Sequence, residues 1–187
     1  LLYQRTLKAA QATLQDGRPL SAAMLRTMHQ GLLSFGRGAE KTPGQFKTEQ
    51  NYIGRRGSRR IDFVPIAPEH LSAGLDALFA YINTSDANPL IKTAIAHIEF
   101  EALHPFKDGN GRIGRMLIPL LLWQMKKISA PHFYISHFFE ENKDEYIGRM
   151  RAVSAQGDWS GWCAFFCRAV SEQATQNLDI AEQITAL

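Results

Sequence analysis

The sequence predicts one mainly α-helical domain that carries a single short β-hairpin near residues 50–64. Apolar residues recur at helical spacing along most of the chain, and a glycine-rich, basic stretch over residues 36–68 interrupts this pattern. The 187 residues are 45% hydrophobic and 21% charged, a composition typical of a globular domain with its own core. No internal repeat or linker divides the chain, so residues 1–187 are expected to form a single domain.

The first half of the chain is expected to hold two helices and the hairpin. Apolar spacing predicts helices over residues 2–14 and 20–33, and Ser21 is a typical N-cap for the second helix. Two short β-prone segments, residues 50–54 and 60–64, flank a stretch rich in glycine and arginine. This arrangement predicts a two-stranded hairpin.

The second half is expected to be helical. Pro68 and Asn88-Pro89 are typical helix starts, and Pro105 marks the end of the helix that follows Asn88. Further helices are predicted over residues 111–127, over residues 143–155 and from Asp158-Trp159 onward. Pro119 should kink the first of these, because proline removes a backbone donor.

Charge and hydropathy limit the classes of function. Basic residues exceed acidic ones by only 21 − 18 = 3, and four arginines gather near the hairpin tip: Arg55, Arg56, Arg59 and Arg60. Such a cluster is more often a solvated tip than a nucleic-acid contact, so we favour the solvated tip. No apolar run reaches the roughly 18 residues that a membrane span needs, which predicts no membrane partner.

Cysteine usage indicates the compartment. Cys163 and Cys167 lie four residues apart on an apolar helical stripe, which predicts buried, reduced thiols rather than a disulfide or a zinc site. We therefore expect a reducing compartment, the cytoplasm. The chain begins with Leu1-Leu2 rather than methionine, so a fragment of a longer protein is expected and a removed leader stays open.

One segment of twelve residues, HPFKDGNGRIGR, concentrates polar chemistry at the start of a predicted helix. Gly109, Asn110 and Gly111 can adopt the positive φ angles that turn successive N–H groups toward one anion, and the helix adds its own unpaired N–H groups. Arg112 and Arg115 follow three residues apart, so both could pair with the same polyphosphate. This pattern predicts a phosphate-binding cradle.

The same segment supplies a base and a metal ligand. His104 can accept a proton near neutral pH, and the hard carboxylate of Asp108 could bind Mg²⁺ that bridges two phosphates. The spacing Gly109-x-Gly111-x-x-Gly114 also fits a dinucleotide fingerprint, but that fingerprint must follow a β-strand and here a helix precedes it. No Gly-Lys-Ser/Thr sequence of a P-loop is present. Phosphoryl-type transfer to a hydroxyl is therefore the expected reaction class.

Residues 104–115 resemble the signature of the Fic family, His-x-Phe-x-Asp/Glu-Gly-Asn-Gly-Arg-x-x-Arg, at every specified position. Residues 43–54 are similar to the segment that leads into the Fic hairpin, and Gly157-Asp158-Trp159 resembles the start of the last core helix. The resemblance implies a Fic-like helical bundle. It also implies protein AMPylation: the transfer of AMP from ATP to a Ser, Thr or Tyr hydroxyl of a target protein, with release of pyrophosphate.

The resemblance also implies residue roles. His104 would deprotonate the target hydroxyl, and Asp108 would hold Mg²⁺. The positions implied to bind the nucleotide are Phe106, Gly109, Asn110, Gly111, Arg112 and Arg115 from the motif, Ile53 from the hairpin and Tyr146 near the adenine. The hairpin would act as a flap that holds the target by strand addition through Gln50, Asn51, Tyr52 and Ile53.

Regulation and assembly are only partly indicated. Many Fic proteins carry an inhibitory Ser/Thr-x-x-x-Glu-Gly/Asn helix. Ser136 to Glu140 has the serine–glutamate spacing of this pattern, but Glu141 follows where the pattern requires Gly or Asn. An inhibitory segment or antitoxin-like partner is therefore expected outside this chain, or the protein is unregulated. A homodimer stays open: Trp123, Phe138 and Phe139 could form its surface, although core packing is the favoured use of each.

Other functions also stay open. The same site could remove AMP, or transfer UMP or phosphocholine, because the cradle fixes phosphates and not the group attached to them. A metal hydrolase using His97, Glu101 and His104 is a second enzyme class, although it leaves both arginines without a role. A nucleic-acid-binding or adaptor domain using the basic hairpin of residues 55–60 is the non-enzymatic alternative.

Overall fold

The computed structural model describes residues 2–36, 38–54 and 61–185, and the side chains through residue 183. The predicted basic cluster of Arg55, Arg56, Arg59 and Arg60 lies outside the described residues. Within them, the fold is mainly α-helical with one two-stranded antiparallel hairpin, which confirms the predicted fold class.

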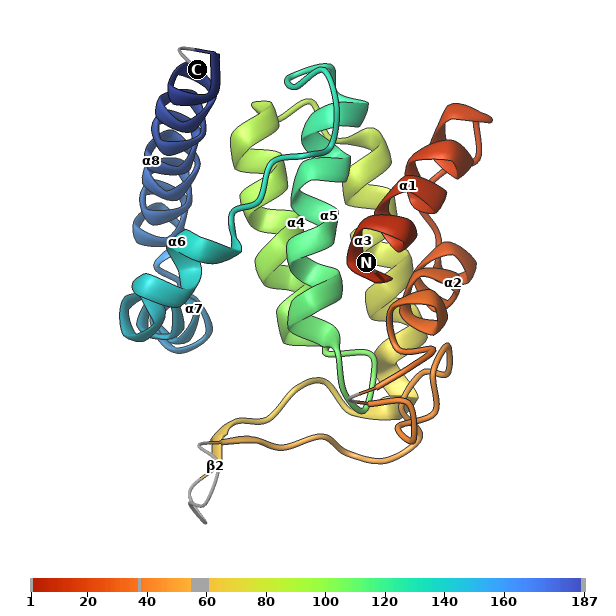
Figure 1. Cartoon of the computed structure of the whole chain (residues 1–187). Coiled ribbons are helices and arrows are strands. Elements are labelled where there is room, and N and C mark those ends of the chain that lie inside the picture. The colour runs from red at the N-terminus through yellow and green to blue at the C-terminus, as the bar shows by residue number, and fades with distance from the viewer. Residues whose placement is uncertain (1, 37, 55–60, 186–187) are drawn as a thin grey trace.

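The helices occupy nearly all of the segments that the apolar spacing predicted (Figure 1). They are α1 (Leu2–Gln15), α2 (Ala22–Leu32), α3 (Leu71–Thr84), α4 (Pro89–Leu103), α5 (Asn110–Gln124), α6 (Ser136–Glu141), α7 (Lys143–Gln156) and α8 (Trp159–Thr185). A short 3₁₀ turn, Pro68–His70, precedes α3. Short α6 was not predicted, and Pro119 lies inside α5 without ending it.

Helix starts follow local capping chemistry. The Ser21 Oγ accepts a hydrogen bond from the Met24 amide at 3.3 Å, which confirms the predicted N-cap of α2. The Asn88 Oδ1 accepts from the Leu90 amide at 2.9 Å, and Pro89 occupies the first turn of α4, where its missing N–H costs nothing.

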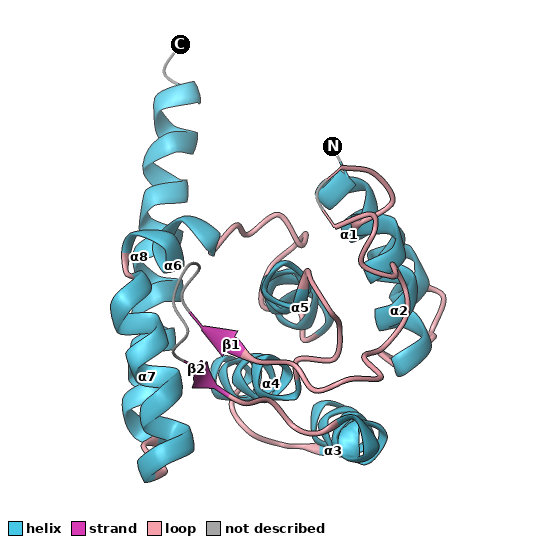
Figure 2. Ribbon diagram, turned by 90° about the horizontal axis from the view of Figure 1, so that it is seen from below, coloured by secondary structure: helices cyan, strands magenta, loops and turns pink. Residues whose placement is uncertain are grey.

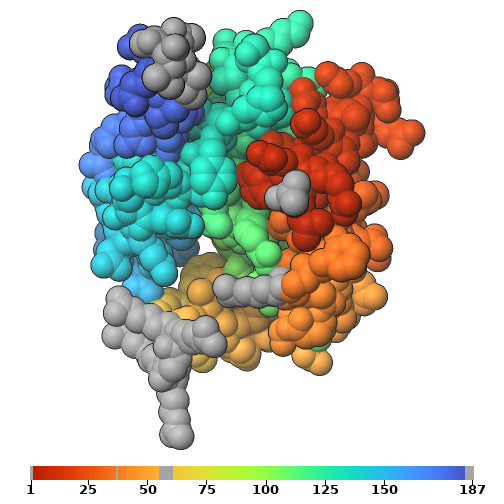
Figure 3. All heavy atoms as spheres, in the orientation of Figure 1, coloured from red at the N-terminus to blue at the C-terminus, as the bar shows by residue number. Residues whose placement is uncertain are grey.

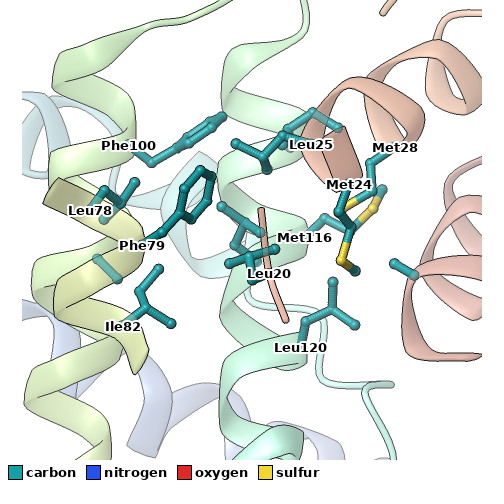
Figure 4. Close-up of a cluster of buried hydrophobic side chains, with 14 of the residues drawn as sticks. Leu20, Met24, Leu25, Met28, Leu78, Phe79, Ile82, Phe100, Met116 and Leu120 are labelled. Carbon is teal, nitrogen blue, oxygen red and sulfur yellow. The ribbon is translucent and has the colours of Figure 1, made fainter. Parts of the chain in front are cut away.

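Helices α4 and α5 run side by side through the middle of the molecule, with α1, α2 and α3 on one side and α6, α7 and α8 on the other (Figure 1). A hydrophobic cluster fills each side. In the first, leucines and methionines of α2 meet side chains of α3, α4 and α5, including Phe79, Phe100 and Met116 (Figure 4). The second is aromatic and contains Trp162 and Phe166 of α8. The central helix pair is therefore fixed from both faces.

Several side chains assigned from sequence lie in this second cluster. Phe138 and Phe139 are 1% and 3% exposed, which confirms that both belong to the core. Cys163 and Cys167 are free thiols, but they are half-buried rather than fully buried, because α8 lies near the surface. Among the described residues, no helix has both the length and the apolar character needed to cross a membrane.

The hairpin is shorter than predicted. Strands β1 (Ile53–Gly54) and β2 (Ile61–Phe63) pair antiparallel, with Ile53 opposite Phe63 and Gly54 opposite Ile61. Seen from below, the hairpin lies by the ends of α4 and α7 (Figure 2). The Arg151 guanidinium of α7 is 2.8 Å from the Asp62 carboxylate of β2, so an ion pair links the hairpin to the helical body.

Candidate active site

The motif segment forms the tight connection between α4 and α5, at the hairpin end of the molecule (Figure 1). Helix α4 ends at Leu103, and His104 takes the left-handed conformation with φ 45°. Gly109, with φ 85°, is the N-cap of α5, which begins at Asn110. A positive φ is unfavourable for a residue with a side chain, so the surroundings must hold His104 in place.

Asn110 closes the loop with its own side chain. Its Oδ1 accepts from the Phe106 amide at 2.8 Å, and its Nδ2 donates to the Phe106 carbonyl at 2.7 Å. The residue is 2% exposed, so the expected contact between Asn110 and phosphate could use only its backbone N–H. The side chain instead fixes the shape of the turn.

The expectation that Phe106 binds the nucleotide is corrected by its burial. The ring is 0% exposed and stacks face to face on His29, with 3.8 Å between ring centroids and 2° between ring planes. Phe46 packs against the same ring. Phe106 thus anchors the loop in the hydrophobic core, beneath the surface that a nucleotide could reach.

Lys47, outside the motif, braces the backbone on either side of His104. Its ammonium donates to the Leu103 carbonyl at 3.0 Å, and its amide donates to the Pro105 carbonyl at 2.8 Å. Lys47 is 3% exposed, and burial lowers the pKa of its ammonium. Lysine caps helix C-termini favourably, because the last carbonyls are otherwise unpaired. No sequence pattern singled Lys47 out.

The side chains of Gln50 and Asn51 bond to backbone carbonyls of the hairpin and of the motif loop. The Asn51 Nδ2 donates to the His104 carbonyl at 3.2 Å and to the Phe106 carbonyl at 2.9 Å. The Gln50 Nε2 donates to the Asn51 and Pro65 carbonyls. Both side chains thus brace the hairpin and the motif loop, while strand addition of a target along the backbone of residues 50–53 stays a prediction. Tyr52 is 62% exposed, and Ile53 is half-buried.

His104 is neutral at physiological pH. Burial lowers its pKa from 6.5 to about 4, although the backbone carbonyl of Glu101 opposes this shift. Its Nδ1 atom is shielded from solvent and has no hydrogen-bond partner among the described residues. An uncharged imidazole in this position can accept a proton.

Asp108 lies at the edge of the cradle with part of its carboxylate open. Its Oδ1 accepts from the Gly109 amide at 2.6 Å and is 3.8 Å from an Arg112 nitrogen. The side chain is 31% exposed, which leaves oxygen surface for another partner. One accessible carboxylate beside a phosphate cradle fits Mg²⁺, because this ion commonly takes one or two carboxylates and completes its shell with phosphates and water.

Arg112 and Arg115 line one side of a cavity of about 840 Å³. Side chains of α1 between Tyr3 and Gln11, residues 131–134, Ser136 and Glu140 form the other walls. On the face shown in Figure 3, α1 lies beside the segment that leads into α6. The Arg115 Nε donates to the buried Ser136 Oγ at 3.0 Å, so α6 aims the second motif arginine.

The buried His97 and the half-buried Tyr146 form a hydrogen-bonded pair behind the motif helix. The His97 Nδ1 lies 3.1 Å from the Gly114 carbonyl, and its Nε2 lies 2.9 Å from the Tyr146 hydroxyl. A carbonyl can only accept, so Nδ1 carries the proton and Nε2 accepts from the tyrosine. The Tyr146 hydroxyl is thus engaged in the core, and burial raises its pKa. Where the adenine lies relative to Tyr146 stays a prediction.

The same hydrogen bonds argue against the metal-hydrolase alternative that uses His97, Glu101 and His104. Both ring nitrogens of His97 have partners, so neither is free to bind a metal with Glu101 and His104. The described part of the chain contains no group of three or more His, Cys, Asp and Glu side chains placed to hold a metal ion. Glu101 is a buried carboxylate whose pKa burial raises to about 7, against the nearby Arg115 charge.

The sequence profile of the Fic/DOC family matches residues 19–122, which is more than half of the chain and includes the whole motif loop. The chain belongs to the Fic/DOC family. This Fic/DOC chain is 35% identical to protein adenylyltransferase fic-1 of Caenorhabditis elegans over 82 residues. The match covers 42% of the chain and 15% of the nematode protein.

Solved Fic structures share the fold. A Fic family protein from Desulfovibrio desulfuricans has a TM-score of 0.79 at 21% identity, over 96% of this Fic/DOC chain and 53% of that one. A fragment of Fic-1 from C. elegans has a TM-score of 0.69 at 22% identity, over 97% of this chain and 51% of that one. The chain therefore spans about half the length of these solved relatives.

Proposed function

We propose that this Fic/DOC chain transfers AMP from ATP to a hydroxyl of a target protein. One observation carries the proposal: a neutral, half-buried histidine lies on the turn between α4 and α5, directly before the N-terminus of α5 and its two arginines, Arg112 and Arg115. The adenylyltransferase name of the nematode relative supports the same reaction. Since AMP transfer generates a proton and a pyrophosphate, it needs a base and an anion site side by side.

In the proposed reaction, the target hydroxyl oxygen attacks the α-phosphorus of ATP. A new oxygen–phosphorus bond forms, the bond from the α-phosphorus to the bridging oxygen of the β-phosphate breaks, and pyrophosphate leaves with that electron pair. His104 accepts the hydroxyl proton, which its depressed pKa allows at neutral pH. The product is AMP joined to the target side chain through a phosphodiester.

The chain's own groups would hold the phosphates. The N–H groups at the start of α5 form the positive end of the helix dipole, and Arg112 and Arg115 line the adjoining cavity. Asp108 would hold Mg²⁺, which, when bound, would neutralise charge on the phosphates. In such reactions positioning and charge neutralisation supply most of the acceleration.

The outer hairpin is the proposed contact for the target. Tyr52, Ile61 and Val64 are 62%, 53% and 53% exposed, so apolar surface lies beside a short strand pair. An extended target segment could add along this edge and present its hydroxyl toward His104. The expected inhibitory segment or antitoxin-like partner would have to reach Arg115 through the cavity beside α1.

Labelling tests the proposal. The chain is incubated with Mg²⁺, ATP labelled on the α-phosphate and an extract, in parallel with H104A and with the exposed-site control H70A. We expect label on discrete proteins with the parent and H70A, and a loss of at least about 100-fold with H104A. Equal labelling by H104A would disprove the role of His104. Release of AMP from modified proteins, or transfer from UTP or CDP-choline only, would replace AMP transfer with one of the alternatives.

A further inference from the structure

His29 of α2 contacts the motif loop although it lies far from it in the sequence. The side chain is 0% exposed. Its Nε2 is 2.8 Å from the Asp108 carbonyl oxygen, and the Gly44 amide donates to its Nδ1 at 2.8 Å. One ring face stacks on Phe106. The imidazole is thus held at both nitrogens and on one face.

These contacts determine the tautomer of His29. A backbone amide can only donate, so the Nδ1 that faces Gly44 carries a lone pair. A carbonyl can only accept, so the proton sits on Nε2 and is donated to Asp108. Both hydrogen bonds are satisfied at once by the neutral ring, and burial lowers the His29 pKa in the same direction.

The carbonyl that His29 holds belongs to the peptide that joins Asp108 to Gly109. A trans peptide is planar, so the direction of its carbonyl fixes the direction of its N–H. That N–H, on Gly109, donates to the Asp108 carboxylate at 2.6 Å. A Cβ on Gly109 would lie 3.4 Å from the His29 Nε2 and 3.3 Å from Leu33, so the peptide has little room to turn.

We propose that His29 is a positioning residue of the phosphate site: through the Asp108 carbonyl it sets the Asp108–Gly109 peptide plane, and with it the direction of the Asp108 carboxylate and the first N–H groups of the cradle. The effect of His29 on nucleotide binding rests on the proposed function. Its effect on the Asp108–Gly109 peptide does not, because that effect concerns only the orientation of one peptide. A histidine with a purely structural role would loosen α2 and the loop at Gly44 when replaced, without a selective effect at Gly109.

Two substitutions separate the bonds. In H29N the amide reaches the position of Nδ1, so its oxygen can still accept from Gly44 while the bond to Asp108 is lost. In H29Q the amide reaches the position of Nε2, so its N–H can still donate to Asp108 while the bond from Gly44 is lost. Both variants lose the imidazole that stacks on Phe106, which makes each the matched control of the other.

Amide hydrogen exchange reads out the result in the whole chain. We expect H29N to accelerate exchange about fivefold at Gly109, whose N–H donates to the Asp108 carboxylate, and to leave Gly44 protected. H29Q should do the reverse, since a neutral hydrogen bond contributes roughly 1 kcal/mol. Acceleration of the same amides in both variants, or unchanged exchange at Gly109 in H29N, would overturn the proposal. If neither variant folds, nitrogen NMR of the parent decides: a proton on Nδ1 at pH 7 contradicts the geometry, and one on Nε2 coupled to the Asp108 carbonyl supports it.

A binding measurement connects the orientation to the ligand. Calorimetry with Mg²⁺ and a non-hydrolysable ATP analogue should give a Kd about fivefold weaker for H29N and close to the parent value for H29Q. If the parent itself does not bind the analogue, the proposed function fails while the exchange experiment still decides the role of His29. Equal weakening in both variants, with selective exchange at Gly109 in H29N, would overturn the link to nucleotide binding.

Discussion

His97 should make the stability of this protein fall as the pH is lowered. The imidazole is 1% exposed, and burial lowers its pKa from 6.5 to about 4. In the unfolded chain the group protonates near pH 6.5, whereas in the folded chain it stays neutral until about pH 4. The stabilisation is therefore fully present above pH 6.5 and is lost as the pH falls toward 4.

The magnitude follows from the two pKa values. One pKa unit corresponds to about 1.4 kcal/mol, so the 1.5 units between pH 6.5 and pH 5 correspond to about 2 kcal/mol. Replacing His97 by phenylalanine removes this titration and keeps an aromatic ring beside Phe139 and Trp162. H97F should be less stable than the parent at pH 7, because the Gly114 carbonyl and the Tyr146 hydroxyl lose a partner.

Urea unfolding at pH 7 and pH 5 measures the effect. The free energy of unfolding of the parent should fall by about 2 kcal/mol more than that of H97F over this interval. Comparing the two proteins cancels the other titrating groups, including Glu101, whose raised pKa acts in the opposite direction. F165L disturbs the same cluster without removing a titrating group and should keep the pH dependence of the parent. If H97F and the parent lose stability equally, the neutral, buried assignment of His97 is wrong.

Three further predictions follow from contacts around the site. The rate of target modification should stay constant as the pH falls from 7 to 5 and should decline near pH 4, because His104 stays unprotonated down to its pKa of about 4. A pH–rate profile with its midpoint near 6.5 would contradict this assignment. G114A should lower the free energy of unfolding by about 1–3 kcal/mol in urea titrations, because the new Cβ would overlap the Glu101 carboxylate. R151A should speed proteolysis of the hairpin by less than about tenfold, since the partly exposed ion pair between Arg151 and Asp62 contributes about 1 kcal/mol at most. An unchanged cleavage rate would show that this ion pair does not restrain the hairpin.

Much of the fold could be read from local patterns. The apolar spacing, Ser21 and Asn88-Pro89 gave the starts of α2 and α4, because these signals act over a few residues. The short helix α6 was missed, because six residues are too few to display a period. The position of the hairpin was predicted correctly, but its described strands, Ile53–Gly54 and Ile61–Phe63, are shorter than the predicted segments 50–54 and 60–64.

The motif could be recognised from the sequence by itself because its chemistry is contiguous. His104, Asp108 and the two arginines lie within twelve residues, and the helix end, glycine turn and helix start that orient them are local features. Such features depend on neighbouring residues, so their spacing is visible in the sequence. The mainly α class was determined at this level, and the phosphate cradle was predicted at it.

Only the tertiary structure decided how the cradle is held. His29 and Asn51 bond to motif carbonyls across 79 and 53 residues of sequence, and Lys47 bonds to the carbonyl of Leu103, just before the motif, across 56 residues. Each is a single polar residue, and a hydrogen bond between distant segments leaves no period or spacing in the sequence. The inward roles of Phe106 and Asn51 were missed for the same reason: whether a side chain faces ligand or core depends on which helices pack around it, and that is settled by the burial of the whole chain.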